Sequence, residues 1–218
     1  MCGENTAHQA HVPVEQFMTD AVAETIKTDS NFAKELEHAW GTIQKVHKVH
    51  TSDDGNETTM RSYINPVVIA AAMLSEGVTF GEEVKIEGPY GSGPVDFAFK
   101  YKDTIVCVTE AKDDDLRHGL RQNIAQLAAT RSERKRKFAA MNDDKKLTFY
   151  GIATTSYFWQ LIELKENVVK SSVRIVGSFP STEDMKDKER IGGVIAHIVN
   201  VFNKCKKNYD DAVEEAAK

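Results

Sequence analysis

Two acidic side chains and one lysine stand at a spacing that suits metal-assisted chemistry. Asp96 falls within one predicted strand, and the next predicted strand carries Glu110 and Lys112. Side chains on a strand alternate between its faces, so Glu110 and Lys112, roughly 7 Å apart, are expected to share a face. If the two strands form a hairpin, Asp96 lies opposite them. Two carboxylates and an ammonium in this arrangement can bind a divalent cation and activate a water for hydrolysis of a phosphodiester.

The hydrophobic pattern predicts the elements that would hold these side chains. Three consecutive strands are predicted over 83–87, 94–101 and 104–112, with a glycine-rich turn over 88–93. A helix from residue 57 or 58 to Ser75 precedes them, and a long helix capped by residues 113–115 runs to about Met141. A buried strand follows over 146–154. The order αβββαβ predicts an α/β fold with a mixed central sheet flanked by helices.

Further elements are predicted at both ends of this core. Residues 14–50 have helical periodicity with a break at Asp29 and Ser30, and the region 1–50 is interpreted as an N-terminal helical extension. Two strands over 156–164 and 168–176 are predicted to form a hairpin, and a final helix is predicted over 181–208 with a frayed tail after it. The remainder, 51–218, is interpreted as one domain that contains the candidate site.

Composition narrows the class of protein. The chain has 218 residues, a net charge of −5 and 28% charged residues, values that are ordinary for a globular protein. No long apolar window predicts a membrane span, and the first residues lack the pattern of a secretory signal, so an intracellular protein with reduced cysteines is expected. The region 116–138 is locally basic, with seven lysines and arginines against one acid, which favours contact with phosphates.

The order of elements, with Asp on the second strand and Glu-x-Lys on the third, resembles the PD-(D/E)XK superfamily of restriction-endonuclease-like nucleases. The segments ETTMRSYINPV (57–67), GPYGSGPVDFAF (88–99), TEAK (109–112), GLRQNIAQLAA (119–129) and YGIATTSYFW (150–159) also resemble the nuclease-like domains of Crinkler-type effectors of oomycetes and fungi. This resemblance covers about residues 57–165. It implies a restriction-endonuclease-like fold and a nuclease that uses Mg²⁺ or Mn²⁺.

The resemblance also implies roles for individual residues. Asp96 and Glu110 would bind the metal, and the backbone carbonyl of Ala111 would complete the site. Lys112 would orient or deprotonate the attacking water or stabilise the developing charge, although it also fits a lysine that reaches solvent from a strand end. Glu57 would supply a further acid, or it is a first-turn glutamate favoured by the helix dipole. Gln122 would reach the active site, or it is simply solvated.

A set of residues on the long helix is predicted to contact nucleic acid. The alternative is that these residues form a solvated face of the helix, since cations are favoured near a helix C-terminus. The candidates are Arg117, Arg121, Gln126, Arg131, Arg134 and Lys135. The basic run 131–137 also resembles a nuclear-localisation signal, although it falls inside the predicted helix.

The sequence therefore leaves two classes of function open. The first is a metal-dependent nuclease, with DNA favoured over RNA by the resemblance alone, acting as a Crinkler-like effector or as an intracellular repair or defence enzyme. The second is a catalytically inactive nuclease-like fold that binds nucleic acid or a protein partner.

Overall fold

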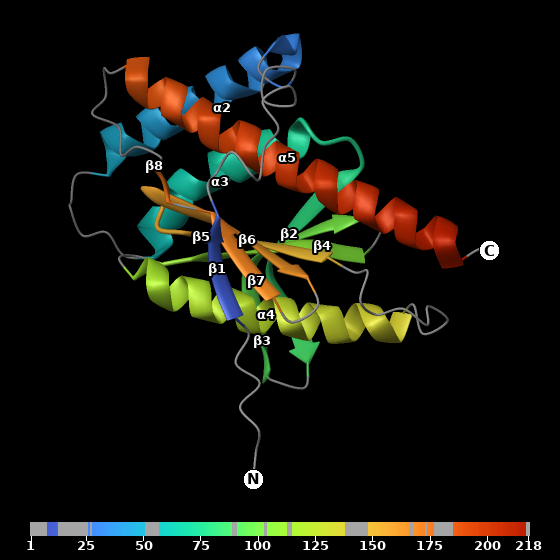
Figure 1. The fold of residues 1–218 in the computed structure, drawn as a ribbon. Coiled ribbons are helices and arrows are strands. Elements are labelled where there is room, and N and C mark those ends of the chain that lie inside the picture. The colour runs from blue at the N-terminus through green and yellow to red at the C-terminus, as the bar shows by residue number, and fades with distance from the viewer. Residues whose placement is uncertain are drawn as a thin grey trace.

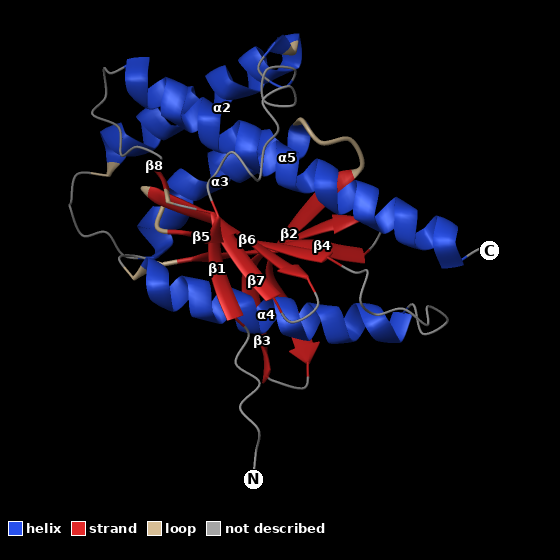
Figure 2. Ribbon diagram, in the orientation of Figure 1, coloured by secondary structure: helices blue, strands red, loops and turns tan. Residues whose placement is uncertain are grey.

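The structure is a computed structural model that describes residues 8–12, 26, 28–50, 57–88, 91–102, 104–112, 115–137, 148–165, 168–172, 174–176 and 185–216. Within these residues the chain forms four helices and eight strands (Figures 1 and 2). The helices are α2 (Ser30–Val49), α3 (Glu57–Met73), α4 (Leu116–Lys137) and α5 (Met185–Ala216). The strands are β1 (His8–Val12), β2 (Val78–Gly88), β3 (Gly91–Tyr101), β4 (Thr104–Ala111), β5 (Thr148–Thr154), β6 (Phe158–Lys165), β7 (Val168–Ser172) and β8 (Ile175–Val176).

The strands form one mixed sheet. Their order is β1-β7-β6-β5-β4-β3-β2, and β8 pairs with β6 beside this path. The β4–β5 and β1–β7 pairs are parallel, and the others are antiparallel. The predicted order αβββαβ is confirmed as α3, β2, β3, β4, α4 and β5.

Helices cover both faces of the sheet (Figure 1). One hydrophobic cluster joins α2, α3 and α5 to one face, with Trp40, Ile64, Phe99 and Phe202 among its buried members. A second cluster joins α4 to the other face, around Val108, Leu127 and Phe149. The predicted α/β class is therefore confirmed, with the sheet as the middle layer.

The central position of β4 follows from its composition. Its residues from Val106 to Ala111 are all buried, because helices pack on both faces and β3 and β5 pair along both edges. Any charged side chain on this strand is consequently removed from water. That constraint makes Glu110 the unusual residue of β4.

Several predicted boundaries were wrong. The strand predicted over 83–87 extends over Val78–Gly88, and the single strand predicted over 168–176 is two strands, β7 and β8, which pair with different parts of β6. The tail predicted to fray after residue 208 is helical to Ala216, where Tyr209 and Ala212 are buried. The pairing of β1 with β7 was not predicted, and the division of the chain at residues 50 and 51 stays a prediction.

Glycines allow α4 to lie close to the sheet. A Cβ atom at Gly88 of β2 would lie 2.4 Å from the Cα of Ala129, so the helix and the strand meet where no side chain intervenes. At Gly151 of β5, a Cβ atom would lie 1.9 Å from Oδ1 of Asn123. The Asn123 amide is fully buried and donates to the carbonyl oxygens of Val108 (3.1 Å) and Ile152 (3.2 Å), which fixes α4 over β4 and β5.

The Asn123 contact can be tested by a single methyl group. Gly151→Ala is expected to lower the free energy of unfolding by about 1–3 kcal/mol, because the added Cβ must displace a hydrogen-bonded buried amide. Urea denaturation measures this change. The control is Gly193→Ala in α5, where nothing lies within 4 Å of the added atom and alanine favours the helix. Equal stability of the two variants would contradict the close approach of Asn123.

Candidate active site

The two candidate acids lie side by side on neighbouring strands. Phe97 pairs with Thr109 in the antiparallel β3–β4 ladder. Asp96 precedes Phe97 and Glu110 follows Thr109, so the two acids lie opposite each other. Both are buried, with 8% and 2% of their surface exposed. The Asp96 Oδ2 atom accepts a hydrogen bond from the backbone N–H of Ala111 at 2.7 Å. The hairpin that the predicted placement of Asp96 required is confirmed, and the roles of the two acids stay predictions.

Glu110 and Lys112 share a face, as their spacing predicts. The Lys112 Nζ atom lies 2.8 Å from Oε1 of Glu110. The backbone N–H of Lys112 donates to the carbonyl of Thr154 at 2.9 Å, which extends the β4–β5 pairing past the end of β4 and fixes the direction of the lysine. Gly119 helps to make room, because a Cβ atom there would lie 3.1 Å from the Cγ atom of Lys112.

The Glu110 carboxyl group is held by two hydrogen-bond donors in a dry environment. Its Oε2 atom accepts a hydrogen bond from Nε2 of Gln126 at 2.6 Å, and its Oε1 atom meets Lys112. Burial raises the pKa of Glu110, the hydrogen bonds from Lys112 and Gln126 lower it, and the negative charge of Asp96 raises it, with a net upward shift. Because burial disfavours the ionised form of Glu110, any additional positive charge nearby would stabilise its carboxylate.

Asp96 has a cationic partner that the sequence did not reveal. Arg61 of α3 makes an ion pair with Oδ1 of Asp96, and its other terminal nitrogen lies 3.0 Å from Oε1 of Glu83 on β2. Arg61 is the only lysine or arginine between residues 57 and 73. A single basic residue on a largely apolar helix was the available signal, but the direction of its side chain depends on how α3 packs on the sheet.

The donor set fits a hard divalent cation. Asp96 and Glu110 offer buried carboxylate oxygens at one place, and Mg²⁺ usually takes one or two carboxylates together with water and substrate phosphate. Among the residues whose side chains are described, no group of three or more His, Cys, Asp or Glu surrounds this place. Glu57 begins α3, four residues before Arg61, but its side chain lies outside the described part of the chain. The role of the Ala111 carbonyl stays a prediction, since Ala111 meets Asp96 through its N–H.

A hollow of about 250 Å³ lies next to Gln126, the residue that binds Glu110. It lies between the start of β3 and the middle of α4, and its lining residues are Ile86, Ser92, Gly93, Pro94, Gln122, Ala125, Gln126 and Ala129. Gln126 therefore both lines the hollow and holds Glu110. Gln122, predicted to reach the active site, is half-buried on the same wall.

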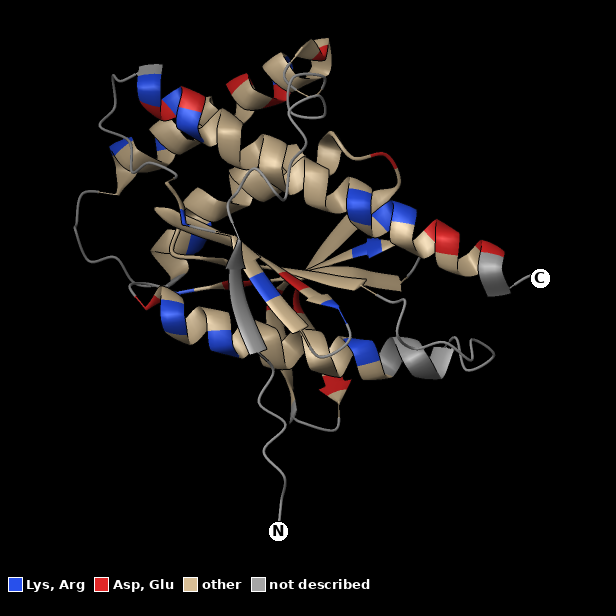
Figure 3. Ribbon diagram, viewed as in Figure 1, with Lys and Arg blue, Asp and Glu red and all other residues tan. Residues whose placement is uncertain are grey.

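The basic residues of α4 have different surroundings. Arg117 and Arg121 are exposed and four residues apart, so they present charge on one side of the helix, and Figure 3 shows basic positions at its start. Arg131 is half-buried. The side chains of Arg134 and Lys135 lie outside the described residues. Gln126, predicted to contact nucleic acid, is instead 8% exposed and bound to Glu110.

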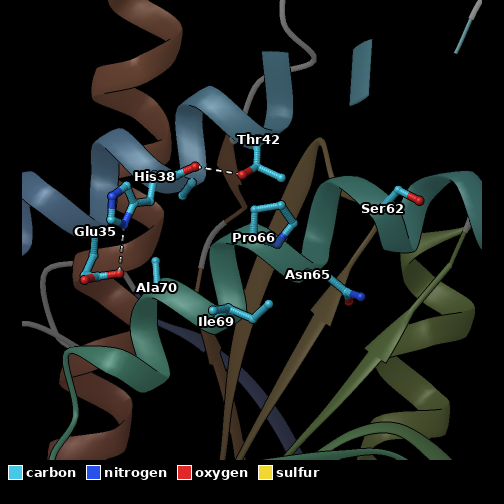
Figure 4. Close-up of a pocket in the computed structure, with 9 residues that line it drawn as sticks. Glu35, His38, Thr42, Ser62, Asn65, Pro66, Ile69 and Ala70 are labelled. Carbon is cyan, nitrogen blue, oxygen red and sulfur yellow. Dashed lines mark hydrogen bonds and ion pairs between the residues drawn. The ribbon is translucent and has the colours of Figure 1, made fainter. Parts of the chain in front are cut away.

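A second hollow, also about 250 Å³, lies between α2 and α3 rather than at the strand ends (Figure 4). On its α2 wall, His38 lies 3.8 Å from Glu35, and the Thr42 hydroxyl donates to the His38 carbonyl at 2.9 Å. Ile69, on its wall, is 44% exposed. The Thr42 hydroxyl bonds the main chain and not the His38 imidazole, so this contact does not pair a nucleophile with a base, and the site at Asp96 and Glu110 remains the candidate for chemistry.

Comparison with known proteins gives one informative relationship. No protein-family model matches the chain. The chain is similar to Crinkler effector protein 1 of Rhizophagus irregularis, with 30% identity over 158 residues that cover 69% of the chain and 33% of that protein. The chain thus spans about a third of the length of the curated relative that it matches. This distant relationship supports the predicted resemblance to Crinkler effectors, and it carries no information on nuclease activity. Across the described segments, no helix has the length and hydropathy needed to cross a bilayer.

The raised pKa of Glu110 predicts a pH-dependent stability. The folded protein holds a proton on Glu110 at pH values where the unfolded chain has lost it, so wild-type stability falls as pH rises from about 4.5 through the folded-state pKa. Glu110→Gln has no such proton. The stability of this variant relative to wild type is therefore expected to increase between pH 4 and pH 7, in urea titrations with EDTA present. Glu214→Gln, an exposed position, controls for the loss of a charge. A stability difference that stays constant with pH would contradict the desolvation of Glu110.

Proposed function

We propose that this protein is a metal-dependent nuclease of the PD-(D/E)XK type, with Asp96, Glu110 and Lys112 as its catalytic residues. The observation that carries the proposal is the buried pairing of Asp96 with Glu110, with the Lys112 ammonium 2.8 Å from the glutamate. Two carboxylates on adjacent strands are costly to bury unless a cation or a function compensates them. The αβββαβ order and the Glu-x-Lys spacing agree with this assignment.

The roles of the residues follow from their contacts. Asp96 and Glu110 would hold Mg²⁺ or Mn²⁺, which when bound lowers the pKa of water and stabilises charge on a phosphate. Lys112 approaches as a hydrogen-bond donor, which suits stabilisation of the negative charge that develops on the phosphate. Gln126 holds the Glu110 carboxylate in one orientation through the 2.6 Å hydrogen bond. Arg117 and Arg121 are exposed on the same helix and would contact the phosphate backbone.

The biological setting of the proposal rests on the relative. The similarity to Crinkler effector protein 1 favours a role as an effector, and the basic run 131–137 favours action in a nucleus, where DNA is the substrate. Glu57, Gln122, Arg131, Arg134 and Lys135 retain their proposed roles near the metal or along the nucleic acid.

Cleavage assays test the catalytic assignment. The purified chain is incubated with plasmid DNA, single-stranded DNA and RNA in the presence of Mg²⁺, Mn²⁺ or EDTA. Cleavage is expected only with a divalent metal, and Asp96→Asn, Glu110→Gln and Lys112→Met are each expected to lower its rate at least about 100-fold. Glu87→Gln is the matched control, because Lys85 and Glu87 form a 2.9 Å pair two residues apart on the exposed part of β2. Wild-type rates in the three site variants would exclude this active site.

One observation favours a second candidate function, a binding module without turnover. Both acids already have cationic partners within the protein, because Arg61 pairs with Asp96 and Lys112 pairs with Glu110. Such self-neutralised acids also occur in purely structural networks. A binding module would retain nucleic acid in EDTA, with an affinity that falls steeply with salt and is unchanged in Glu110→Gln. Arg117→Gln combined with Arg121→Gln would then reduce the salt dependence.

A further inference from the structure

Arg61 occupies a position that links the candidate metal site to its surroundings. Its guanidinium bridges two acids on neighbouring strands, Asp96 of β3 and Glu83 of β2. The arginine side chain is 25% exposed and the Asp96 side chain 9%, whereas the Glu83 side chain is 69% exposed. The bridge therefore has a buried end at the site and an open end in solvent.

The buried end places a permanent positive charge on a candidate metal ligand. The Oδ2 atom of Asp96 already accepts from the Ala111 N–H, and Oδ1 meets Arg61, so both oxygens have donors. An arginine keeps its charge at any pH that the folded protein tolerates. A divalent cation that takes Asp96 as a ligand must displace the guanidinium from Oδ1 or accept a repulsive cation beside it.

At the open end, Glu83 can still bind the Arg61 guanidinium after a metal has displaced it from Asp96. Glu83 adopts φ 52°, a left-handed backbone that a residue other than glycine rarely takes, and it lies between the residues of β2 that pair with Val95 and Phe97. Its carboxylate lies 3.0 Å from the guanidinium of Arg61. Because Glu83 is exposed, Arg61 can keep this partner when it leaves Asp96.

We propose that Arg61 is an internal counter-cation that competes with the divalent metal for Asp96 and so lowers the metal affinity of the site, with Glu83 retaining the arginine when the metal binds. Arg61 acts through Asp96 and is a positioning residue. The inference rests on the proposed function only for the presence of a metal at Asp96. It requires neither nucleic acid nor turnover.

Calorimetric titration with Mn²⁺, in the absence of nucleic acid, tests the competition. Arg61→Met is expected to bind Mn²⁺ at least about fivefold more tightly than wild type, because one partly buried charge contact no longer opposes the metal. Arg61→Lys keeps the charge but not the guanidinium fork that reaches both acids, so its Mn²⁺ affinity is expected to lie between those of wild type and Arg61→Met. Asp96→Asn is expected to abolish the effect of Arg61→Met, since it removes the ligand for which the two cations compete.

A second variant tests the inference without removing the buried cation, in case Arg61→Met does not fold. Glu83→Gln changes an exposed side chain and is expected to weaken Mn²⁺ binding about threefold, because the displaced arginine loses its other partner. In the Arg61→Met background the same change is expected to have no effect, because Glu83 acts through the arginine. The rise in melting temperature at saturating Mn²⁺, larger for Arg61→Met than for wild type, provides an independent readout.

Each outcome decides the proposal. Equal or weaker Mn²⁺ binding by a folded Arg61→Met overturns it, as does the absence of binding by both wild type and this variant. If Arg61→Met does not fold, wild-type affinity in Glu83→Gln overturns it. Tighter binding by Arg61→Met, with no cleavage of any nucleic acid by any form, would support the competition and reject the nuclease. Metal-dependent cleavage, with the same Mn²⁺ affinity in wild type and Arg61→Met, would support the nuclease and reject the competition.

Discussion

The removal of the Glu110 carboxyl group from water is the constraint on which the rest of the site depends. An isolated carboxylate in the middle of a sheet would cost several kcal/mol, and few strands carry one without compensation. Here the compensation comes from Lys112, just past the end of the same strand, and from Gln126 on α4. The backbone hydrogen bond of Lys112 to Thr154 fixes the position of the lysine. The upward shift of the Glu110 pKa shows that these partners offset the desolvation only in part. An additional cation beside Glu110 would stabilise its ionised form further.

The two acids depend on helices from opposite faces of the sheet. Asp96 receives its cation from α3, whereas Glu110 receives its amide donor from α4. Each helix is attached to the sheet by its own hydrophobic cluster, so the charges at the strand ends are positioned by two separate sets of apolar contacts. A buried polar group can be kept in place only when the surrounding packing is fixed. The site is accordingly a product of the whole three-layer arrangement and not of the Glu-x-Lys segment alone.

The parts of this arrangement that follow from local periodicity could be predicted from the sequence. Alternation on a strand places Glu110 and Lys112 on one face, and a run of apolar residues marks β4 as central, so the core of the site and the αβββαβ order were accessible. Arg61 was not, because its contact depends on the rotation of α3 about its own axis against the sheet. The short segment His8–Val12 has no strand pattern, and its partner β7 lies far along the chain, so its pairing is set by tertiary contacts that periodicity does not encode. The burial of Gln126 was likewise hidden, since a glutamine beside an apolar stripe reads equally well as solvated.

The close approach of β2 and α4 makes Gly88 important for the position of α4 above the sheet. Ala129, which faces this glycine, lies one turn beyond Gln126 on the same helix. The height of that turn above the sheet is therefore fixed by a missing side chain, and this height determines whether an amide of fixed length reaches the glutamate. Gly88 bears no charge and touches neither carboxylate, yet in this way it influences how well the Gln126 amide stabilises the Glu110 carboxylate. Among relatives, a larger residue in place of Gly88 is therefore expected to occur together with a side chain of different length or type in place of Gln126.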